Sequence, residues 1–366
     1  MRVTFDGGVL GKGLYALQNT INTRSTLPIL ANTLIETKDG HIQLSGTDLE
    51  LGVTTTIPAH IHEAGATTIP IKRFGDLVKE LPQQHPVILT VKKNHITVVE
   101  CGTSHFKLMG LPPEEFPKLP TLPEQHTLQL PQQTLLTMLN LTAFAMSHDE
   151  TRYVLNGAFL MAKKGRIRLV ATDGRRLAMT EHLIPGAASI PEQQAIIPTK
   201  TIHELHRLLG ADELVKITFG NNQVRFDLGA TTIISRTIEG EFPNYEQVIP
   251  PEAPSKMKLS REALLLAIRR ASLWTTQESQ SIKFDLSKNQ LVVSKQTPEL
   301  GEAREEVEAE YHGQELSVGF NPSYLMDVLK NLPDEAIEVE LPGPERPGVI
   351  RIKDRYTYIV LPMQLT

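Results

Sequence analysis

Hydrophobic residues along the chain follow two periods, and the same order of periods recurs three times. Apolar positions three or four residues apart predict amphipathic helices. The segments between them have an apolar residue at every second position, as in strands with one buried face. The helical patterns lie at 10–22, 72–81, 131–146, 199–209, 260–274 and 321–331. The regular succession of one longer helix, strands, one shorter helix and more strands predicts an internal triplication.

Short landmarks fix the repeat and its limits. Two residue pairs recur at matching places: Thr47-Asp48 with Thr172-Asp173, and Phe116-Pro117 with Phe242-Pro243. Proline-rich stretches at 111–123 and 250–254 lie between the repeats and are typical of linkers. We therefore predict three domains, at 1–122, 123–252 and 253–366.

The ratio of helices to strands indicates the fold class. Each repeat contains two predicted helices and many more strand segments. Because two helices cannot cover both faces of so much sheet, we expect them on one side. The predicted fold is α+β, with helices on one face of mostly antiparallel sheets.

Composition narrows the class of protein further. The chain has 366 residues, of which 40% are apolar and 22% charged, as in ordinary globular proteins. No apolar run approaches the roughly 20 residues of a membrane helix, and the amino terminus lacks a secretory apolar region. The single cysteine, Cys101, cannot form an internal disulfide. We expect a cytoplasmic protein that does not bind a membrane.

The charge is unevenly distributed along the chain. The net charge of −5 by itself disfavours a nucleic-acid partner. However, the six helical segments carry ten basic residues against five acidic ones, so the strands and loops hold the negative excess. The basic residues are Lys12, Lys72, Arg73, Lys79, Lys200, Arg207, Arg261, Arg269, Arg270 and Lys330. A basic helical side can attract phosphates, although solvated helix faces also carry such residues.

A second charge pattern suggests how copies of the chain could join. Residues 302–310 read EAREEVEAE, whereas the first repeat carries Lys92, Lys93, His105 and Lys107. An acidic edge that meets a basic edge of another copy, head to tail, can close a ring. The alternative is a solvated strand with no partner.

The motifs of common enzyme classes are missing from the sequence. It has no phosphate-binding loop, dinucleotide fingerprint, nucleophile elbow or zinc-ligand series. His60 with His62, and His203 with His206, could each supply two metal ligands, but no third is evident, so surface histidines are the simpler interpretation. Asp48 and Asp173 each follow a threonine at a strand end, where a carboxylate commonly closes a turn. We expect no catalytic residue, metal or cofactor.

At this level of detail the sequence resembles a known family from end to end. The residues that carry the resemblance are Arg24-Ser25-Thr26-Leu27-Pro28-Ile29-Leu30, Gly46-Thr47-Asp48-Leu49-Glu50, Arg152-Tyr153-Val154-Leu155-Asn156-Gly157, Ala171-Thr172-Asp173-Gly174-Arg175-Arg176-Leu177, Gly240-Glu241-Phe242-Pro243-Asn244-Tyr245 and Leu361-Pro362-Met363. With the triplication, they resemble the beta sliding clamp family of bacterial DNA polymerase III. The resemblance implies three domains of DNA-clamp type and a homodimeric ring that encircles duplex DNA without sequence preference and confers processivity.

The resemblance also implies site residues. Positions that match the family's DNA contacts are Arg24, Lys72, Arg73, Asp149, Tyr153 and Val154. Positions that match its groove for partner peptides are Leu155, Thr172, Gly174, Arg175, Arg176, Leu177, Pro243, Val248, Val360, Leu361, Pro362 and Met363. The implied partners are the polymerase catalytic subunit, the clamp loader and other proteins with a clamp-binding motif. Gln247 and Gln364 depart from the family, because related clamps often carry arginine there.

For the ring joint we expect the apolar residues Phe106, Leu108 and Leu273, with core packing as the alternative. Two other functions remain open on the residues alone. A triplicated small-molecule-binding protein would have one deep pocket and no charge asymmetry between helices and strands. A hydrolase would need Asp48 and Asp173 as an acid–base pair or a metal set in one cleft.

Overall fold

The computed structural model describes residues 1–20, 26–123, 127–185, 191–210, 213–253, 256–298, 300–353 and 355–365. The chain folds into two compact units. Unit 1 contains residues 1–135 and 200–237, and unit 2 contains residues 136–199 and 238–366. The middle repeat therefore contributes to both units.

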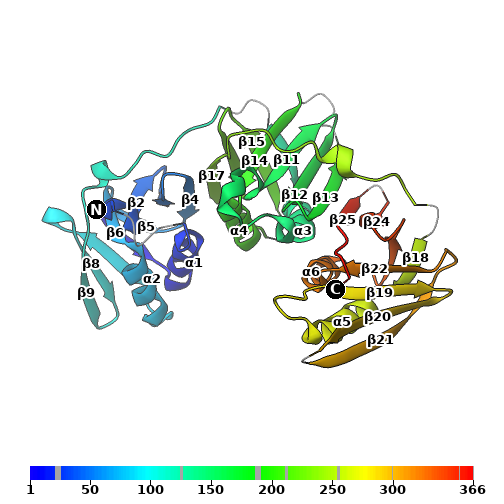
Figure 1. Ribbon diagram of the computed structural model, residues 1–366. Helices are drawn as coiled ribbons and strands as arrows, with labels where there is room; N and C mark the ends of the chain where they lie inside the picture. The colour runs from blue at the N-terminus through cyan, green and yellow to red at the C-terminus, as the bar shows by residue number, and fades with distance from the viewer. Residues whose placement is uncertain are drawn as a thin grey trace. The chain divides into compact units, whose positions relative to one another are not determined.

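Unit 1 contains two sheets (Figure 1). The first has the order β5-β1-β7-β8-β9, with β1 (Arg2–Phe5), β5 (His60–Glu63), β7 (Val87–Val91), β8 (Ile96–Cys101) and β9 (Ser104–Met109). The second has the order β10-β15-β16-β17-β4-β3-β2-β6, with β2 (Asn32–Lys38), β3 (His41–Thr47), β4 (Leu51–Ile57), β6 (Ala66–Pro70), β10 (Thr127–Pro131), β15 (Leu214–Phe219), β16 (Gln223–Asp227) and β17 (Thr231–Arg236). Pairing of β4 with β17, in the register Val53↔Ile233, makes one sheet from strands of the first and second repeats.

Helices of the first repeat pack together against the sheet. Helix α1 (Gly7–Leu17) contacts β3, β4 and α2 (Ile71–Glu80). It begins at Asp6, whose side chain accepts a hydrogen bond of 3.0 Å from the Gly8 amide. Leu10, Leu14 and Leu17 form its buried stripe. The prediction was 10–22, but α1 begins three residues earlier and ends at Leu17, before residues with low helix propensity at 19 and 20; residues 21 and 22 lie outside the described ranges.

Unit 2 contains one long succession of paired strands, in the order β14-β11-β12-β13-β25-β24-β23-β18-β21-β20-β19-β22. Their bounds are β11 (Gly157–Lys163), β12 (Arg166–Thr172), β13 (Arg176–Leu183), β14 (Gln193–Pro198), β18 (Lys256–Ser260), β19 (Ile282–Ser287), β20 (Gln290–Thr297), β21 (Gly301–Glu310), β22 (Leu316–Phe320), β23 (Ala336–Glu340), β24 (Gly348–Ile352) and β25 (Tyr356–Val360). Strands β13 and β25 pair in the register Ala178↔Tyr358 and join the second repeat to the third. By contrast, β18 meets β21 at only two residue pairs, Lys258↔Glu310 and Leu259↔Ala309.

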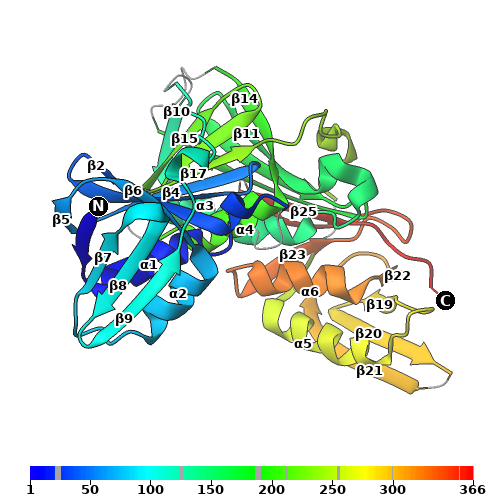
Figure 2. The same ribbon diagram turned by 90° about the vertical axis from the view of Figure 1, so that its left-hand side faces the viewer.

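The helices of the third repeat lie side by side over its sheet, as Figures 1 and 2 show. Helix α5 (Arg261–Ala271) packs against α6 (Pro322–Asn331) and against β20 and β21. Asn321 caps α6, because its side chain accepts a hydrogen bond of 2.9 Å from the Ser323 amide, and Pro322 occupies the first turn. The predicted start of this helix is confirmed.

Two further helices belong to the middle repeat, α3 (Gln132–Thr142) and α4 (Thr199–Leu208). Short 3-10 helices are η1 (Pro28–Ala31), η2 (Lys93–His95), η3 (Pro113–Glu115), η4 (Ala143–Ala145), η5 (Glu150–Leu155), η6 (Tyr245–Val248) and η7 (Ser272–Trp274). Six α-helices thus stand where the sequence predicted them, and each strand pair in the described parts of the chain is antiparallel. The α+β prediction is confirmed. No α-helix within the described ranges has the length and apolar character needed to cross a membrane.

Candidate functional site: a tight turn and an apolar cluster in unit 2

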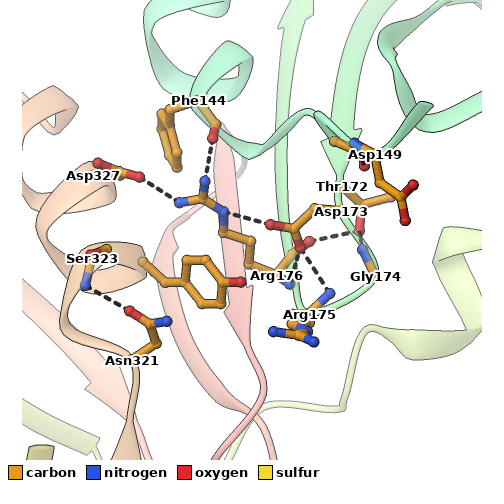
Figure 3. Close-up of polar contacts among 12 residues, drawn as sticks. Phe144, Asp149, Thr172, Asp173, Gly174, Arg175, Arg176, Asn321, Ser323 and Asp327 are labelled. Atoms are coloured by element: carbon orange, nitrogen blue, oxygen red, sulfur yellow. Dashed lines mark hydrogen bonds and ion pairs between the residues drawn. The ribbon is translucent and has the colours of Figure 1, made fainter. Parts of the chain in front are cut away.

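The predicted groove is organised by the turn between β12 and β13 (Figure 3). Asp173 accepts hydrogen bonds from the amides of Arg175, at 2.8 Å, and Arg176, at 3.0 Å. The Thr172 hydroxyl donates to the Arg176 carbonyl at 2.6 Å and accepts from the Gly174 amide at 3.1 Å. Gly174 has φ +85°, a conformation that suits glycine. The turn is therefore held by its own side chains.

The first repeat contains the same turn at Thr47–Leu51. Thr47 Oγ1 donates to the Leu51 carbonyl at 2.9 Å, and Asp48 accepts from the Leu51 amide at 2.7 Å. Leu49 takes the position of Gly174 with φ 78°. The second oxygen of Asp48 pairs with Lys200 of α4. The interpretation of both aspartates as turn-closing residues is confirmed, and neither carboxylate is left free for acid–base chemistry.

The guanidinium of Arg176 lies beside the turn, and each of its three nitrogens donates one hydrogen bond (Figure 3). It donates to Asp327 Oδ2 at 2.7 Å, to the Phe144 carbonyl at 2.6 Å and to Asp173 Oδ2 at 3.1 Å. The guanidinium carbon also lies 4.5 Å from the centre of the Tyr324 ring. Burial alone would lower the pKa of Arg176, but the hydrogen bond to Asp327 and the nearby charges raise it, so the side chain stays charged.

The charge of Arg176 is thus paired with carboxylates inside the protein. The side chain is only 9% exposed, so its cation faces the protein interior rather than solvent. Sequence reasoning placed Arg176 in the groove but did not identify Asp327 or Phe144 as its partners. No sequence pattern marks either residue, because each comes from a distant segment.

An apolar cluster lies beside the turn. It consists of the buried residues Leu155, Phe159, Val170, Leu177, Ile196, Phe242, Tyr245, Val349 and Ile359. The rings of Phe159 and Phe242 stack with their centres 5.0 Å apart. Two predicted groove residues, Leu155 and Leu177, belong to this cluster. Phe159 and Tyr245 were not among the residues predicted for the groove.

The other predicted groove residues divide by exposure. Leu155, Thr172, Arg176, Leu177 and Val360 are buried, Pro362 and Met363 are half-buried, and Gly174, Arg175, Pro243, Val248 and Leu361 are exposed. The carboxyl-terminal segment is tied to the turn, because the Leu361 amide donates to the Arg175 carbonyl at 2.9 Å. Val360 pairs with Arg176 across β13 and β25. Unit 2 therefore contains every predicted groove residue, some buried and others, among them the apolar Val248 and Leu361, exposed.

The predicted DNA contacts lie in both units. In unit 1, Lys72 and Arg73 are exposed in the first turn of α2, whereas Arg24 lies outside the described residues. In unit 2, Tyr153 is exposed and Val154 is half-buried against the apolar cluster.

Asp149, the remaining predicted DNA contact, stabilises the start of η5. Its carboxylate caps η5 by accepting hydrogen bonds from the Thr151 amide, at 3.0 Å, and hydroxyl, at 2.7 Å. The bonds from Thr151 hold the pKa of Asp149 below its ordinary value. Asp149 is therefore a charged cap beside Tyr153 rather than a free phosphate-binding group.

The candidate joint residues lie on exposed edges. Phe106 is 36% exposed and Leu108 is half-buried on β9, at the edge of its sheet. Leu273 in η7 is 71% exposed, so core packing does not explain Phe106 or Leu273. Lys92, Lys93, His105 and Lys107 are also exposed near β9.

Histidine geometry does not suggest a metal. The rings of His60 and His62 lie 4.5 Å apart, and His62 shares a hydrogen bond of 3.0 Å with Thr4. Within the described ranges, no group of three or more His, Cys, Asp or Glu side chains could hold a metal ion.

Three domain models of one protein family match this chain in order. Models of the N-terminal, central and C-terminal domains of the DNA polymerase III beta subunit match residues 1–120, 129–244 and 246–364. The curated beta sliding clamps of Salmonella typhimurium and Escherichia coli are each 33% identical over 371 aligned residues and are covered in full, as is this chain.

Solved structures agree with these matches. The Pseudomonas aeruginosa DNA polymerase III subunit beta is 33% identical with a TM-score of 0.94, and the Bacillus subtilis DNA polymerase sliding clamp is 28% identical with a TM-score of 0.95. A Bartonella birtlesii sliding clamp bound to griselimycin is 32% identical with a TM-score of 0.94. In each case both chains are covered in full.

Proposed function

The chain belongs to the DNA polymerase III beta subunit family, the beta sliding clamps, and from this premise we propose how its surfaces bind DNA, a second copy and partner proteins. Its function is that of a DNA sliding clamp, a non-catalytic subunit that gives a DNA polymerase processivity. The observation that carries this conclusion is the match of all three domain models in order along the chain. The small-molecule-binding and hydrolase alternatives have no support among these relatives.

The first proposal concerns DNA. Double-stranded DNA passes through a ring lined by helices and is contacted through phosphates, without sequence preference. Exposed Lys72 and Arg73 on α2 support this, together with Tyr153 and the basic excess of the helical segments. Weak contacts suffice because a closed ring is held by topology, and weak contacts permit sliding.

The second proposal concerns the ring itself. Two copies close it head to tail, with β9 of one copy against β21 of the other. Basic residues accompany β9, whereas β21 carries Glu302, Glu305, Glu306, Glu308 and Glu310. Phe106, Leu108 and Leu273 supply the apolar part of the joint, as expected of interfaces with a hydrophobic core. The domains that form the ring are residues 1–122, 123–252 and 253–366.

The third proposal concerns partner proteins. The groove of unit 2 takes short peptides of the polymerase catalytic subunit, the clamp loader and other proteins with a clamp-binding motif. The apolar cluster and exposed Val248 and Leu361 support this, because such peptides bind through apolar anchors. Griselimycin, which is bound in the Bartonella birtlesii clamp structure, is the probe that we propose for the same groove. A cytoplasmic location fits a protein that works on replicating DNA.

The decisive experiment tests topological binding. The protein is loaded onto nicked circular duplex DNA with a clamp loader and ATP, the circle is then linearised, and the DNA is separated by size exclusion in moderate salt. We expect the protein to co-elute with circles and to be lost from linear DNA. Equal retention on both forms, or loss from both when salt is raised, would show ordinary electrostatic binding and overturn the proposal.

A further inference from the structure

The segment that links the second repeat to the third carries part of the partner groove. Residues 240–253, here called the connecting segment, include η6 and two predicted groove residues, Pro243 and Val248. Val248 is 56% exposed, so its position depends on how η6 is held. The segment has no strand pairing of its own within the described residues. Side chains must therefore fix it.

One arginine of β12 makes most of the polar contacts to η6. Arg168 Nη1 donates to the Tyr245 hydroxyl at 2.9 Å and to Glu246 Oε1 at 2.7 Å. On its other side, Arg168 pairs with Glu181 through Nε, at 2.9 Å, and Nη2, at 2.8 Å. Glu181 also pairs with Arg166 at 2.7 Å. The order Arg166, Glu181, Arg168, Glu246 is thus a chain of alternating charges that ends on the connecting segment.

Glu181 fixes the orientation of the arginine. Two contacts to one carboxylate restrict the guanidinium plane and leave Nη1 directed at η6. Burial alone would lower the pKa of Arg168, but hydrogen bonds to Tyr245, Glu181 and Glu246 raise it. Arg168 therefore holds η6 as a permanent cation.

The apolar side of η6 makes this anchor relevant to the groove. The Tyr245 ring packs against Phe242 and Phe159, with ring centres 6.3 Å and 6.1 Å away. Phe159 belongs to the same buried cluster as Leu155 and Leu177, which form the groove floor. A hydrogen bond to the Tyr245 hydroxyl thus fixes a ring that lies between Arg168 and the floor. Val248 follows three positions later, at the end of η6.

The far end of the connecting segment has a separate anchor. Arg351 donates to the Pro250 carbonyl at 2.5 Å and to Glu340 at 3.2 Å. The Ala253 amide donates to the same glutamate at 3.0 Å. Loss of Arg168 would therefore free η6 without releasing the whole segment.

We propose that Arg168 is a positioning residue for the partner groove, because it holds η6 through Tyr245 and Glu246 and so sets the place of Val248. The inference rests on the proposed peptide-binding function of the groove. It implies that ligand affinity depends on a charge pair that the ligand does not touch. Because Glu246 is largely exposed, salt weakens the pair and with it the binding of an uncharged ligand.

The test measures griselimycin binding by calorimetry at low and high salt for the full chain and matched variants. Arg168→Gln removes the anchor, Glu246→Gln removes one partner, and Tyr245→Phe removes the other without losing the ring. Arg166→Gln is the control, because Arg166 contacts Glu181 but not the connecting segment. We expect Kd to rise about fivefold for Arg168→Gln and about twofold for each partner variant, with no change for Arg166→Gln.

Two readouts separate positioning from a general loss of stability. A double-mutant cycle of Arg168→Gln with Glu246→Gln gives a coupling in Kd only if the pair acts on the groove. The salt dependence of Kd must also flatten in Glu246→Gln, which a merely structural role would not produce.

The outcomes are distinct. Wild-type affinity in Arg168→Gln, or an equal loss in Arg166→Gln, overturns the positioning role while leaving the groove intact. Failure of the unmodified protein to bind griselimycin overturns the proposed groove and the inference with it.

Discussion

Arg176 on β13 donates a hydrogen bond of 2.7 Å to Asp327 on α6, although 151 positions separate the two residues. The contact connects a strand of the second repeat to a helix of the third within unit 2. It adds a charged bond to the strand pairing of β13 with β25. The junction between the second and third repeats is therefore stabilised both by backbone pairing and by one buried cation.

Removal of Asp327 should weaken this junction. Asp327→Asn leaves the Arg176 guanidinium with Asp173 as its one remaining carboxylate partner among the described residues. A buried cation that loses one partner costs about 1–3 kcal/mol, so we expect the thermal midpoint to fall by about 2–5 °C. Calorimetry checks this, with Asp76→Asn as control, because Asp76 is an exposed helical aspartate with no ion pair shown in the structure. Equal midpoints for both variants would contradict the role of Asp327.

Gly174 should be sensitive to a single added methyl group. Gly174→Ala strains a residue at φ +85° and places the new carbon 2.8 Å from Arg152 Nη1. We expect a loss of about 1 kcal/mol in stability and about fivefold weaker griselimycin binding. Gly40→Ala is the matched control, because Gly40 has φ +79° but no neighbour within 4 Å. If both variants bind griselimycin like the unmodified protein, the turn does not shape the groove.

Lys72 and Arg73 should contribute to DNA binding without regard to sequence. Each substitution to alanine removes one phosphate contact, so the slope of log K against log salt should become less negative by about 1. Fluorescence anisotropy on a short duplex at several salt concentrations measures that slope. Lys118→Ala, an exposed lysine of the proline-rich stretch, should leave it unchanged. A change that depends on the DNA sequence would contradict the proposal.

The proposed joint predicts that two exposed apolar residues hold the dimer. Phe106→Ala and Leu273→Ala should each raise the dimer dissociation constant about 5- to 30-fold, because apolar residues at the centre of an interface contribute about 1–2 kcal/mol. Sedimentation velocity over a dilution series measures this. Leu214→Ala removes a comparably exposed leucine of β15 and should have no effect. A dimer that tolerates both joint substitutions would place the interface elsewhere.

The pair of Arg270 and Glu305 predicts a small dependence of stability on pH. Arg270 donates hydrogen bonds of 2.9 Å and 2.6 Å to Glu305, which lowers the pKa of Glu305 from its ordinary value of 4.5. A carboxyl group with a lowered pKa stabilises the fold above its unfolded pKa, and that contribution is lost as pH falls through the folded value. Glu305→Gln should therefore lower the thermal midpoint at pH 7 by about 1 °C, and the difference from the unmodified protein should vanish at acidic pH. Scanning fluorimetry at pH 7, 5, 4 and 3 tests the trend, which an unchanged difference at pH 3 would contradict.

Local patterns were sufficient to predict much of the fold. The helical pattern at 260–274 predicted α5, whose residues Leu264, Ala267, Ile268 and Ala271 are buried. The pattern at 321–331 begins with Asn321 and Pro322, which cap and start α6. The role of Asp173 was also predictable, since the carboxylate bonds amides two and three positions later.

Long-range contacts were not predictable in the same way. The pairing of β13 with β25 joins different repeats. The alternation of apolar and polar residues identifies strands but does not specify which strands become neighbours. The partners of Arg176 and Arg168 depend on that pairing and on the course of the connecting segment. Sequence reasoning therefore proposed the groove residues but could not predict the contacts that Arg168 and Arg176 make.

The pairing of β18 with β21 extends over only two residue pairs, and this has a consequence for solubility. Within the described parts of the chain, most of β21 has no strand partner on the side away from β20, and such edges can pair with strands of other molecules. Its glutamates make two copies of β21 repel each other, so like edges cannot join into fibres. The charges thus disfavour an acidic neighbour and favour a basic strand, and they leave the backbone of β21 free to pair with that strand.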